Sequence, residues 1–231
     1  MKIALFDIDG TILWSRGAGR RSMERALMAV HGAVGAPGYR YDGKTDRQIV
    51  RESMRDAGIP EANVDARMDE VLDRYLTELT VELAGADHQS MILPGVEAIL
   101  DEVESHDGVM LGLLTGNVAL GAEQKLRQVG IDIGRFQVAV FGSDHEVRHE
   151  LPAIAQARAS ARLGRAVPGD AVVVIGDTPS DVACAQPIGA RTIAVATGSF
   201  DVPALAACRP TAVFADLSDT AAVMAAILNH A

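Results

Sequence analysis

The sequence predicts an α/β protein whose doubly wound, mainly parallel sheet carries an inserted all-helical segment. Six short apolar segments mostly lack the alternation of half-exposed strands, which is typical of parallel strands covered on both faces. Helical patterns lie between them, as the crossovers of a doubly wound sheet require. The strands are expected at Lys2–Phe6, Val109–Leu114, Gln137–Phe141, Ala171–Ile175, Arg191–Ala196 and Ala212–Phe214.

Four helices are expected between or before these strands. Pro94 and Pro179 stand where two of them begin, and proline favours the first turn of a helix. The expected helices are Gly95–Ser105, one whose buried face is marked by Leu120, Leu126 and Val129, Leu151–Leu163, and Ser180–Ile188. The Ala-rich tail from Ser199 to Ala231 is expected to form a strand and then a helix.

The stretch from residue 15 to residue 86 interrupts this rhythm. It contains helical patterns at Arg21–His31, Thr45–Ala57 and Asn63–Leu83 but no convincing strand. In the third pattern, apolar residues recur at spacings of three and four, which is typical of an amphipathic helix. We therefore expect an α/β core formed by residues 1–14 and 87–231, with residues 15–86 inserted as a helical domain.

Composition excludes several classes of function. The chain has 231 residues, 31 acidic and 21 basic, and a formal net charge of −10. This charge argues against non-specific nucleic-acid binding, which needs a basic surface. No stretch approaches the roughly 18 apolar residues that span a bilayer, and the apolar run Ile3–Phe6 is too short for a signal peptide. Two cysteines favour a reducing, cytoplasmic compartment.

The strongest chemical motif is Asp7-Ile8-Asp9-Gly10-Thr11, which follows the first strand. Two carboxylates two residues apart would share one side of the chain and repel each other unless a cation or proton compensates. Oxygen ligands with room for water suit Mg²⁺, and the turn at Gly10 and Thr11 could bind an anion. The alternative is an acidic loop in which Asp9 caps the next segment.

A second acidic motif, Gly176-Asp177-Thr178-Pro179-Ser180-Asp181, ends the strand Ala171–Ile175. Taken alone, helix capping explains these residues at least as well as chemistry does. However, four carboxylates gathered at the ends of two strands of one sheet would be costly without a metal.

The third motif is Thr115-Gly116-Asn117, which ends a strand and opens a helix. The Thr115 hydroxyl and the amides at the helix start suit a phosphate, and Gly116 would let the backbone approach a ligand. An ordinary N-cap turn is the alternative.

In this order, the three motifs resemble those of the haloacid dehalogenase-like superfamily. The closer resemblance is to its phosphoglycolate-phosphatase-like branch, which has a Rossmann-like core and a helical C1 cap. The resemblance covers nearly the whole chain, and Pro94-Gly95 fits the return from cap to core. It implies an Mg²⁺-dependent phosphatase acting on a small phosphorylated metabolite of the phosphoglycolate or sugar phosphate type.

The resemblance also implies residue roles. Asp7 would attack phosphorus to form an aspartyl-phosphate, and Asp9 would serve as general acid and then as base for the hydrolytic water. Thr115 would hold phosphate, assisted by Gly116 or Asn117. The implied metal ligands are Asp7, Asp9 through its backbone carbonyl, Asp177 and Asp181. These roles suit phosphoryl transfer, which depends on positioning and charge neutralisation.

One element departs from the family pattern. The family has a basic residue, usually Lys, in the loop after the third strand, but this loop, Ser143–Pro152, contains no lysine. Arg148 is the first candidate to replace it, because a guanidinium binds oxyanions bidentately. His149 fits almost as well by spacing. A surface ion pair of Arg148 with Glu146 or Glu150 is the alternative.

Gly43-Lys44-Thr45-Asp46 resembles the loop by which helical caps of this family reach the site. Lys44 is the expected contact to substrate, whereas Asp46 is expected to cap the helix Arg47–Ala57.

Three other functions were weighed. A haloacid dehalogenase does not need the second acid of the first motif, so Asp9 argues against that activity. A phosphosugar mutase of the same superfamily keeps both aspartates and stays open as an alternative. A catalytically silent metal- or phosphate-binding regulatory protein is a further alternative, since fold does not fix function. Monomer and homodimer are equally compatible with the sequence.

Overall fold

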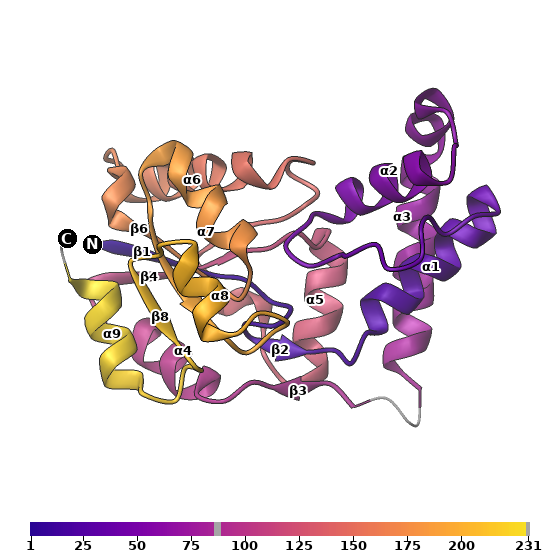
Figure 1. Cartoon of the computed structure of the whole chain (residues 1–231). Helices are drawn as coiled ribbons and strands as arrows, with labels where there is room; N and C mark the ends of the chain where they lie inside the picture. Colours follow the sequence, from indigo (N-terminus) through magenta and orange to yellow (C-terminus); the bar gives the residue numbers. More distant parts are fainter. Residues whose placement is uncertain (86–88, 230–231) are drawn as a thin grey trace.

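The computed structural model describes residues 1–85 and 89–229 and contains a six-stranded parallel sheet (Figure 1). The strand order is β5-β4-β1-β6-β7-β8, so β1 lies centrally between β4 and β6. The strands are β1 (Lys2–Phe6), β4 (Val109–Leu114), β5 (Val138–Val140), β6 (Val172–Gly176), β7 (Arg191–Val195) and β8 (Ala212–Phe214). All six predicted strands are confirmed, as is the α/β fold class.

Helices cover both faces of the sheet, as its continuously apolar strands require. Along β1, Ala4 and Phe6 pack in one core cluster, whereas Ile3 and Leu5 pack in the other. The first cluster includes residues of α4 (Val96–Ser105), α5 (Ala119–Gln128) and α9 (Thr220–Leu228), and the second includes residues of α6 (Leu151–Leu163) and α7 (Pro179–Ala185). The sheet is therefore doubly wound.

Short elements complete the described part of the core. A further helix, α8 (Val202–Ala207), lies between β7 and β8 and was not predicted. Two-residue strands β2 (Leu13–Trp14) and β3 (Met91–Ile92) pair antiparallel and were also missed, because two residues are too few to form a pattern. Short 3-10 helices occupy Ile133–Arg135, Arg148–Glu150, Gly169–Ala171 and Gln186–Ile188.

The prediction that Leu120 marks a buried face was wrong. Leu120 is 59% exposed, whereas Leu126 is fully buried. In α5, Gly121, Ala122 and Lys125 are buried instead, so the inward face of the helix contains small residues and one lysine.

Three helices form a separate unit at the carboxyl ends of the strands (Figure 1). They are α1 (Ala18–His31), α2 (Asp46–Asp56) and α3 (Glu61–Leu83), and with their connections we call residues 15–85 the helical unit. They bury a core of their own, which includes Leu27, Met54 and Tyr75. The expected domain boundary at residues 86 and 87 lies outside the described residues.

The burial difference between two leucines gives a stability test. Leu111 in β4 is fully buried, so Leu111→Ala should lower the free energy of unfolding by about 2–5 kcal/mol, because it removes apolar contacts and leaves a cavity. Leu120→Ala makes the same chemical change at an exposed position and should cost less than about 0.5 kcal/mol. Urea denaturation followed by circular dichroism measures both. Equal losses in the two variants would contradict the assignment of Leu111 to the core.

Candidate active site

Asp7 follows β1 directly and marks the centre of the site. Its backbone N–H still donates to the carbonyl of Ile175 in the neighbouring strand β6, which fixes the residue at the edge of the sheet. The side chain is buried, and burial raises the pKa of the Asp7 carboxyl to about 6 even though Arg148 lies beside it. The sheet thus holds the Asp7 carboxylate in a buried position, where a negative charge is costly without a nearby positive charge or a proton.

Gly10 lets the chain turn tightly against a second carboxylate. Its φ is 80°, a left-handed conformation, and a Cβ at this position would lie 2.3 Å from Oδ2 of Asp177. The hydroxyl of the adjacent Thr11 donates to Oδ1 of Asp177 at 3.3 Å. Thr11 therefore contacts a site carboxylate, and its expected contact with an anion, a phosphate, stays a prediction.

Asp181 caps the helix that follows β6. The hydroxyl of Thr178 accepts from the backbone N–H of Asp181, and Oδ2 of Asp181 accepts from the backbone N–H of Thr178 at 3.0 Å. This is a capping box, so the capping alternative for this motif is realised in the structure. The second oxygen of Asp181, Oδ1, accepts from Arg148. Asp181 is thereby oriented from two sides.

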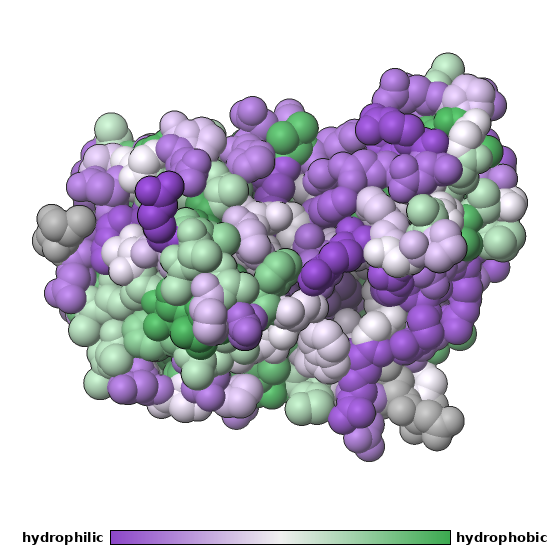
Figure 2. All heavy atoms as spheres, in the orientation of Figure 1, coloured by the Kyte–Doolittle hydropathy of each residue, from purple (hydrophilic) through white to green (hydrophobic). Residues whose placement is uncertain are grey.

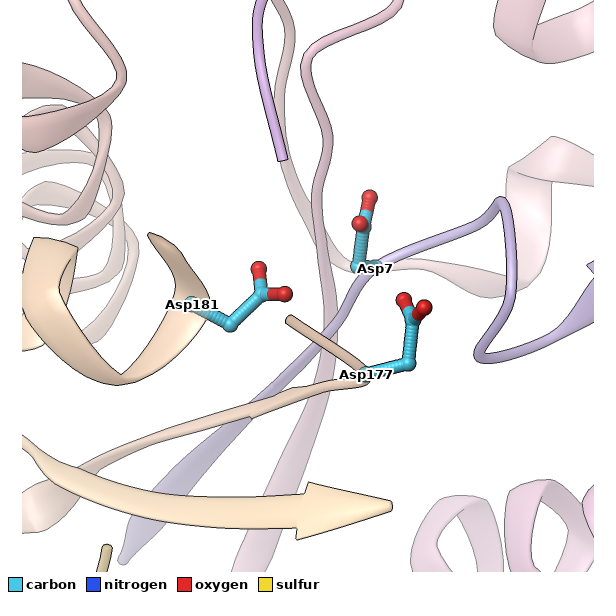
Figure 3. Close-up of side chains that lie close together, drawn as sticks. All are labelled: Asp7, Asp177 and Asp181. Carbon is cyan, nitrogen blue, oxygen red and sulfur yellow. The ribbon is translucent and has the colours of Figure 1, made fainter. Parts of the chain in front are cut away.

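Asp7, Asp177 and Asp181 converge (Figure 3), and one oxygen of each lies within 4.8 Å of the others. All three are buried. Burial raises the pKa of Asp177 well above its usual range, and the neighbouring carboxylates of Asp181 and Asp7 raise it further. Buried carboxylate oxygens that repel one another at this spacing fit a hard divalent cation such as Mg²⁺.

Arg148 supplies positive charge beside these carboxylates. Its Nη2 lies 3.0 Å from Oδ2 of Asp7 and also binds Asp181, and the side chain is buried. Its Nε is buried and has no hydrogen-bond partner of normal geometry among the residues that the structure describes. His149 is exposed, and Glu146 binds Arg51 instead of Arg148.

Asp9 does not belong to this cluster of three carboxylates and binds a lysine instead. Nζ of Lys125 lies 2.7 Å from Oδ2 of Asp9, and Nδ2 of Asn117 donates to the same oxygen at 2.8 Å. Burial alone would raise the pKa of Asp9, but the Lys125 ammonium and the hydrogen bonds from Asn117 and Ser15 hold it below its usual value.

The third motif follows β4, which lies on the other side of β1 from β6. Thr115 is fully buried, and its hydroxyl accepts from Nδ2 of Asn117 at 2.8 Å. Gly116 was expected to let the backbone approach a ligand. In the structure it lets the backbone of the helical unit approach, because a Cβ at position 116 would lie 2.1 Å from the carbonyl oxygen of Lys44. The motif thus binds Asp9 through Asn117 and receives the helical unit at Gly116.

The loop at residues 43–46 seats the helical unit on the core. The backbone N–H of Asp46 donates to the Gly116 carbonyl at 2.8 Å, and Oδ2 of Asp46 accepts from the N–H of Val118 at 2.7 Å. Asp46 therefore binds the start of α5. The expectation that Asp46 caps its own helix was wrong, because the hydroxyl of Thr45 caps α2 by accepting from the N–H of Gln48.

These residues surround a cavity of about 240 Å³ between the core and the helical unit. Figure 2 shows a recess at this junction. The cavity is lined by the predicted residues Asp7, Asp9, Thr115, Gly116, Asn117, Arg148, Asp177 and Lys44, and by Lys125, which was not predicted. Thr11 and Asp181 are absent from its lining, although both contact residues that line it.

Lys44 lines the cavity with its charge already paired. Its Nζ lies 2.5 Å from Oε2 of Glu52 and 2.9 Å from the Tyr39 hydroxyl, and it stacks over the Tyr39 ring. Lys125, by contrast, has no sequence signal beyond its position in a helix. It lies eight residues beyond the third motif, and only the packing of α5 brings it to Asp9.

Comparison with known proteins identifies the family. A model of the haloacid dehalogenase-like hydrolases matches residues 4–186, which is most of the chain. The chain belongs to this family, and the expectation of a hydrolase of this kind is confirmed. No curated protein matches the sequence.

Solved structures share the fold over nearly the whole chain. A predicted phosphoglycolate phosphatase from Haemophilus somnus has a TM-score of 0.70 and 19% identity, with 97% of this chain and 98% of that chain covered. A hydrolase from Pseudomonas syringae has a TM-score of 0.73 and 19% identity, covering 99% and 100%. A protein from Thermotoga maritima, provisionally named a β-phosphoglucomutase, has a TM-score of 0.61 and 23% identity, covering 99% and 100%.

Asp46 gives a pH-dependent prediction. Burial raises the pKa of its carboxyl to about 6, although Lys125 and the Val118 N–H oppose this. The folded protein therefore holds this proton more tightly than the unfolded chain, and the stability contributed here falls as pH rises from about 4 to about 6. Asp46→Asn stays neutral and should lack this fall, gaining up to about 3 kcal/mol over wild type by pH 7.

Urea denaturation in EDTA at several pH values measures this difference. Asp56→Asn is the matched control, since Asp56 is an exposed residue at the far end of the same helix. A difference between Asp46→Asn and wild type that stays constant from pH 4 to pH 7 would contradict the prediction.

Proposed function

We propose that this protein is an Mg²⁺-dependent phosphatase that hydrolyses a small phosphorylated metabolite through an aspartyl-phosphate on Asp7. The observation that carries the proposal is the convergence of Asp7, Asp177 and Asp181 beside Arg148 at the edge of a cavity. A carboxylate nucleophile with nearby compensating positive charge is what phosphoryl transfer requires. The phosphatase and mutase names among structures of this fold agree with phosphoryl chemistry.

Each residue of the site would have its own role in the reaction. Asp7 attacks phosphorus, and the bond between phosphorus and the ester oxygen breaks as the phosphoryl group moves to the carboxylate. Arg148 neutralises charge on the nucleophile and the phosphoryl oxygens. Asp9 would take up a proton when the negative phosphate ester binds beside it, give this proton to the departing alcohol, and then take one from the water that hydrolyses the aspartyl-phosphate. Thr115 and Asn117 hold the phosphoryl oxygens.

Asp7, Asp177, Asp181 and the backbone carbonyl of Asp9 would hold the metal. The three carboxylates fit a divalent cation by their oxygen chemistry, burial and spacing. Bound Mg²⁺ would neutralise charge on the phosphate and on the attacking carboxylate. Because Asp181 also caps α7 and binds Arg148, it would position the other two carboxylates as well.

The helical unit would act as a cap. Its seating depends on the Asp46 contacts with residues 116–118, the Thr45 hydrogen bond to the Glu146 carbonyl and the Arg51–Glu146 ion pair. Breaking these contacts would open the cavity to substrate, and forming them would exclude water from the reaction. We retain residues 15–86 as the extent of this cap and Lys44 as a candidate substrate contact.

The proposal also covers the type of substrate and the cellular compartment. The substrate would be of the phosphoglycolate or sugar phosphate type, which suits a cavity of about 240 Å³. Neither cysteine, Cys184 nor Cys208, forms a disulfide, which supports a reducing cytoplasm. No helix among residues 1–85 and 89–229 has the length and apolar character needed to cross a membrane.

A phosphosugar mutase is the second candidate. The same residues could return the phosphoryl group from Asp7 to another sugar hydroxyl, and structures named for that activity share the fold. Release of inorganic phosphate indicates the phosphatase, whereas formation of an isomer without phosphate release indicates the mutase. Metal binding with neither product would favour the silent regulatory protein.

The nucleophile is tested with Asp7→Asn. This variant should release phosphate more than about 10³-fold more slowly than wild type, because an amide cannot form the aspartyl-phosphate. The measurement is phosphate release from phosphoglycolate, sugar phosphates and p-nitrophenyl phosphate, with Mg²⁺ and with EDTA. The fold should persist, since the change removes one of several buried negative charges.

Asp107→Asn is the matched control, because Asp107 is exposed and precedes β4 at the opposite end of the strands. It should keep wild-type activity. Phosphate release by Asp7→Asn at the wild-type rate would remove Asp7 as nucleophile. Wild-type release that is unchanged in EDTA would remove the metal.

A further inference from the structure

Lys125 is a buried cation that none of the three motifs includes. Its side chain is 5% exposed, and its ammonium lies against the cavity. It has two hydrogen-bond partners in the described part of the chain, Oδ2 of Asp9 at 2.7 Å and Oδ1 of Asn117 at 2.6 Å. Burying an ammonium is costly unless it is paired, so these two contacts fix where it can lie.

These contacts orient Asp9 by one oxygen. Oδ2 of Asp9 accepts from both Lys125 and Asn117, whereas Oδ1 accepts from the Ser15 hydroxyl at 3.4 Å and has no other hydrogen bond within residues 1–85 and 89–229. The Asp9 side chain is 40% exposed even though Lys125 is buried. The triangle of Lys125, Asn117 and Asp9 therefore holds one carboxylate oxygen by two short contacts, and the other, Oδ1, has one long contact, in a residue that lines the cavity.

The helical unit covers this triangle. Gly19 in α1 packs so closely that a Cβ there would lie 3.1 Å from Nζ of Lys125 and 3.7 Å from the Tyr75 hydroxyl. A larger residue at position 19 would press on the ammonium. The position of Lys125 is thus fixed by Asp9 and Asn117 from the core and by Gly19 from the helical unit.

We propose that Lys125 is a positioning residue that holds Asp9 by Oδ2, so that Oδ1 is directed to the leaving group of the substrate. The inference rests on the proposed function, in which Asp9 is the general acid. An ion pair that served stability alone would not need to include this carboxylate. A buried pair is in any case weak evidence for stability, since apolar residues often replace one without loss.

Leaving-group dependence tests the role. An alkyl phosphate needs a proton on its departing oxygen, whereas p-nitrophenyl phosphate releases a stable phenolate with little help. Lys125→Met, which leaves Asp9 poorly oriented, should lower kcat/KM for the alkyl ester by about tenfold or more and for p-nitrophenyl phosphate by less than about threefold. The alkyl ester is whichever of phosphoglycolate, glucose 6-phosphate and glycerol 3-phosphate wild type hydrolyses fastest.

Three variants accompany it. Asp9→Asn should show the same selectivity with a larger fall. Arg127→Met removes an exposed cation from the same helix, where Arg127 pairs with Glu123, and should leave both values unchanged. Gly19→Ala keeps Lys125 but crowds its ammonium, so it should give a smaller fall with the same selectivity. It also keeps the test decisive if Lys125→Met does not fold.

The outcomes separate two failures. If wild type hydrolyses neither class of ester, the proposed function fails. If wild type is active but Lys125→Met and Gly19→Ala lower both kcat/KM values equally, or change neither, Lys125 does not position Asp9 and the inference is overturned. A selective loss on the alkyl ester in either variant, with Arg127→Met unaffected, supports it.

Discussion

The arrangement of this molecule depends on how it compensates carboxylates gathered at the edge of one parallel sheet. The carboxyl ends of parallel strands lie at the same end of a sheet. The residues that follow β1 and β6 are therefore brought together even where their negative charges repel. Asp7, Asp177 and Asp181 are all buried there. Arg148 lies against two of them, while burial still raises the pKa of Asp7 and of Asp177. A divalent cation would compensate the remaining charge.

The helical unit is attached to the same loops that carry the site. Asp46 binds the segment that follows Thr115, and Arg51 and Thr45 bind Glu146, two residues before Arg148. Movement of the helical unit would therefore act directly on the loops that hold the candidate phosphate-binding and charge-compensating residues. Gly116 makes this contact possible, because any side chain there would collide with the Lys44 backbone.

The two basic residues of the site, Arg148 and Lys125, differ in how well the sequence predicts them. Arg148 could be nominated because it stands in the loop where a basic residue was expected, and the structure buries it beside Asp7. Lys125 could not, since a lysine in an amphipathic helix is usually solvated. The buried face of α5 was also misjudged at Leu120, because leucine alone does not show which side of a short helix faces inward.

The sequence by itself determined the six strands, their coverage by helices, the helical insertion and the strand-end residues that we propose as the site. It did so because parallel strands are apolar throughout, and because acidic residues that follow two strands of one parallel sheet meet at the same end of that sheet. Only the tertiary structure decided how the carboxylates divide: Asp7, Asp177 and Asp181 converge, while Asp9 turns to Lys125. It also decided that Asp46 binds α5. These contacts join residues that are far apart in the chain, so the local periodicity of the sequence cannot predict them.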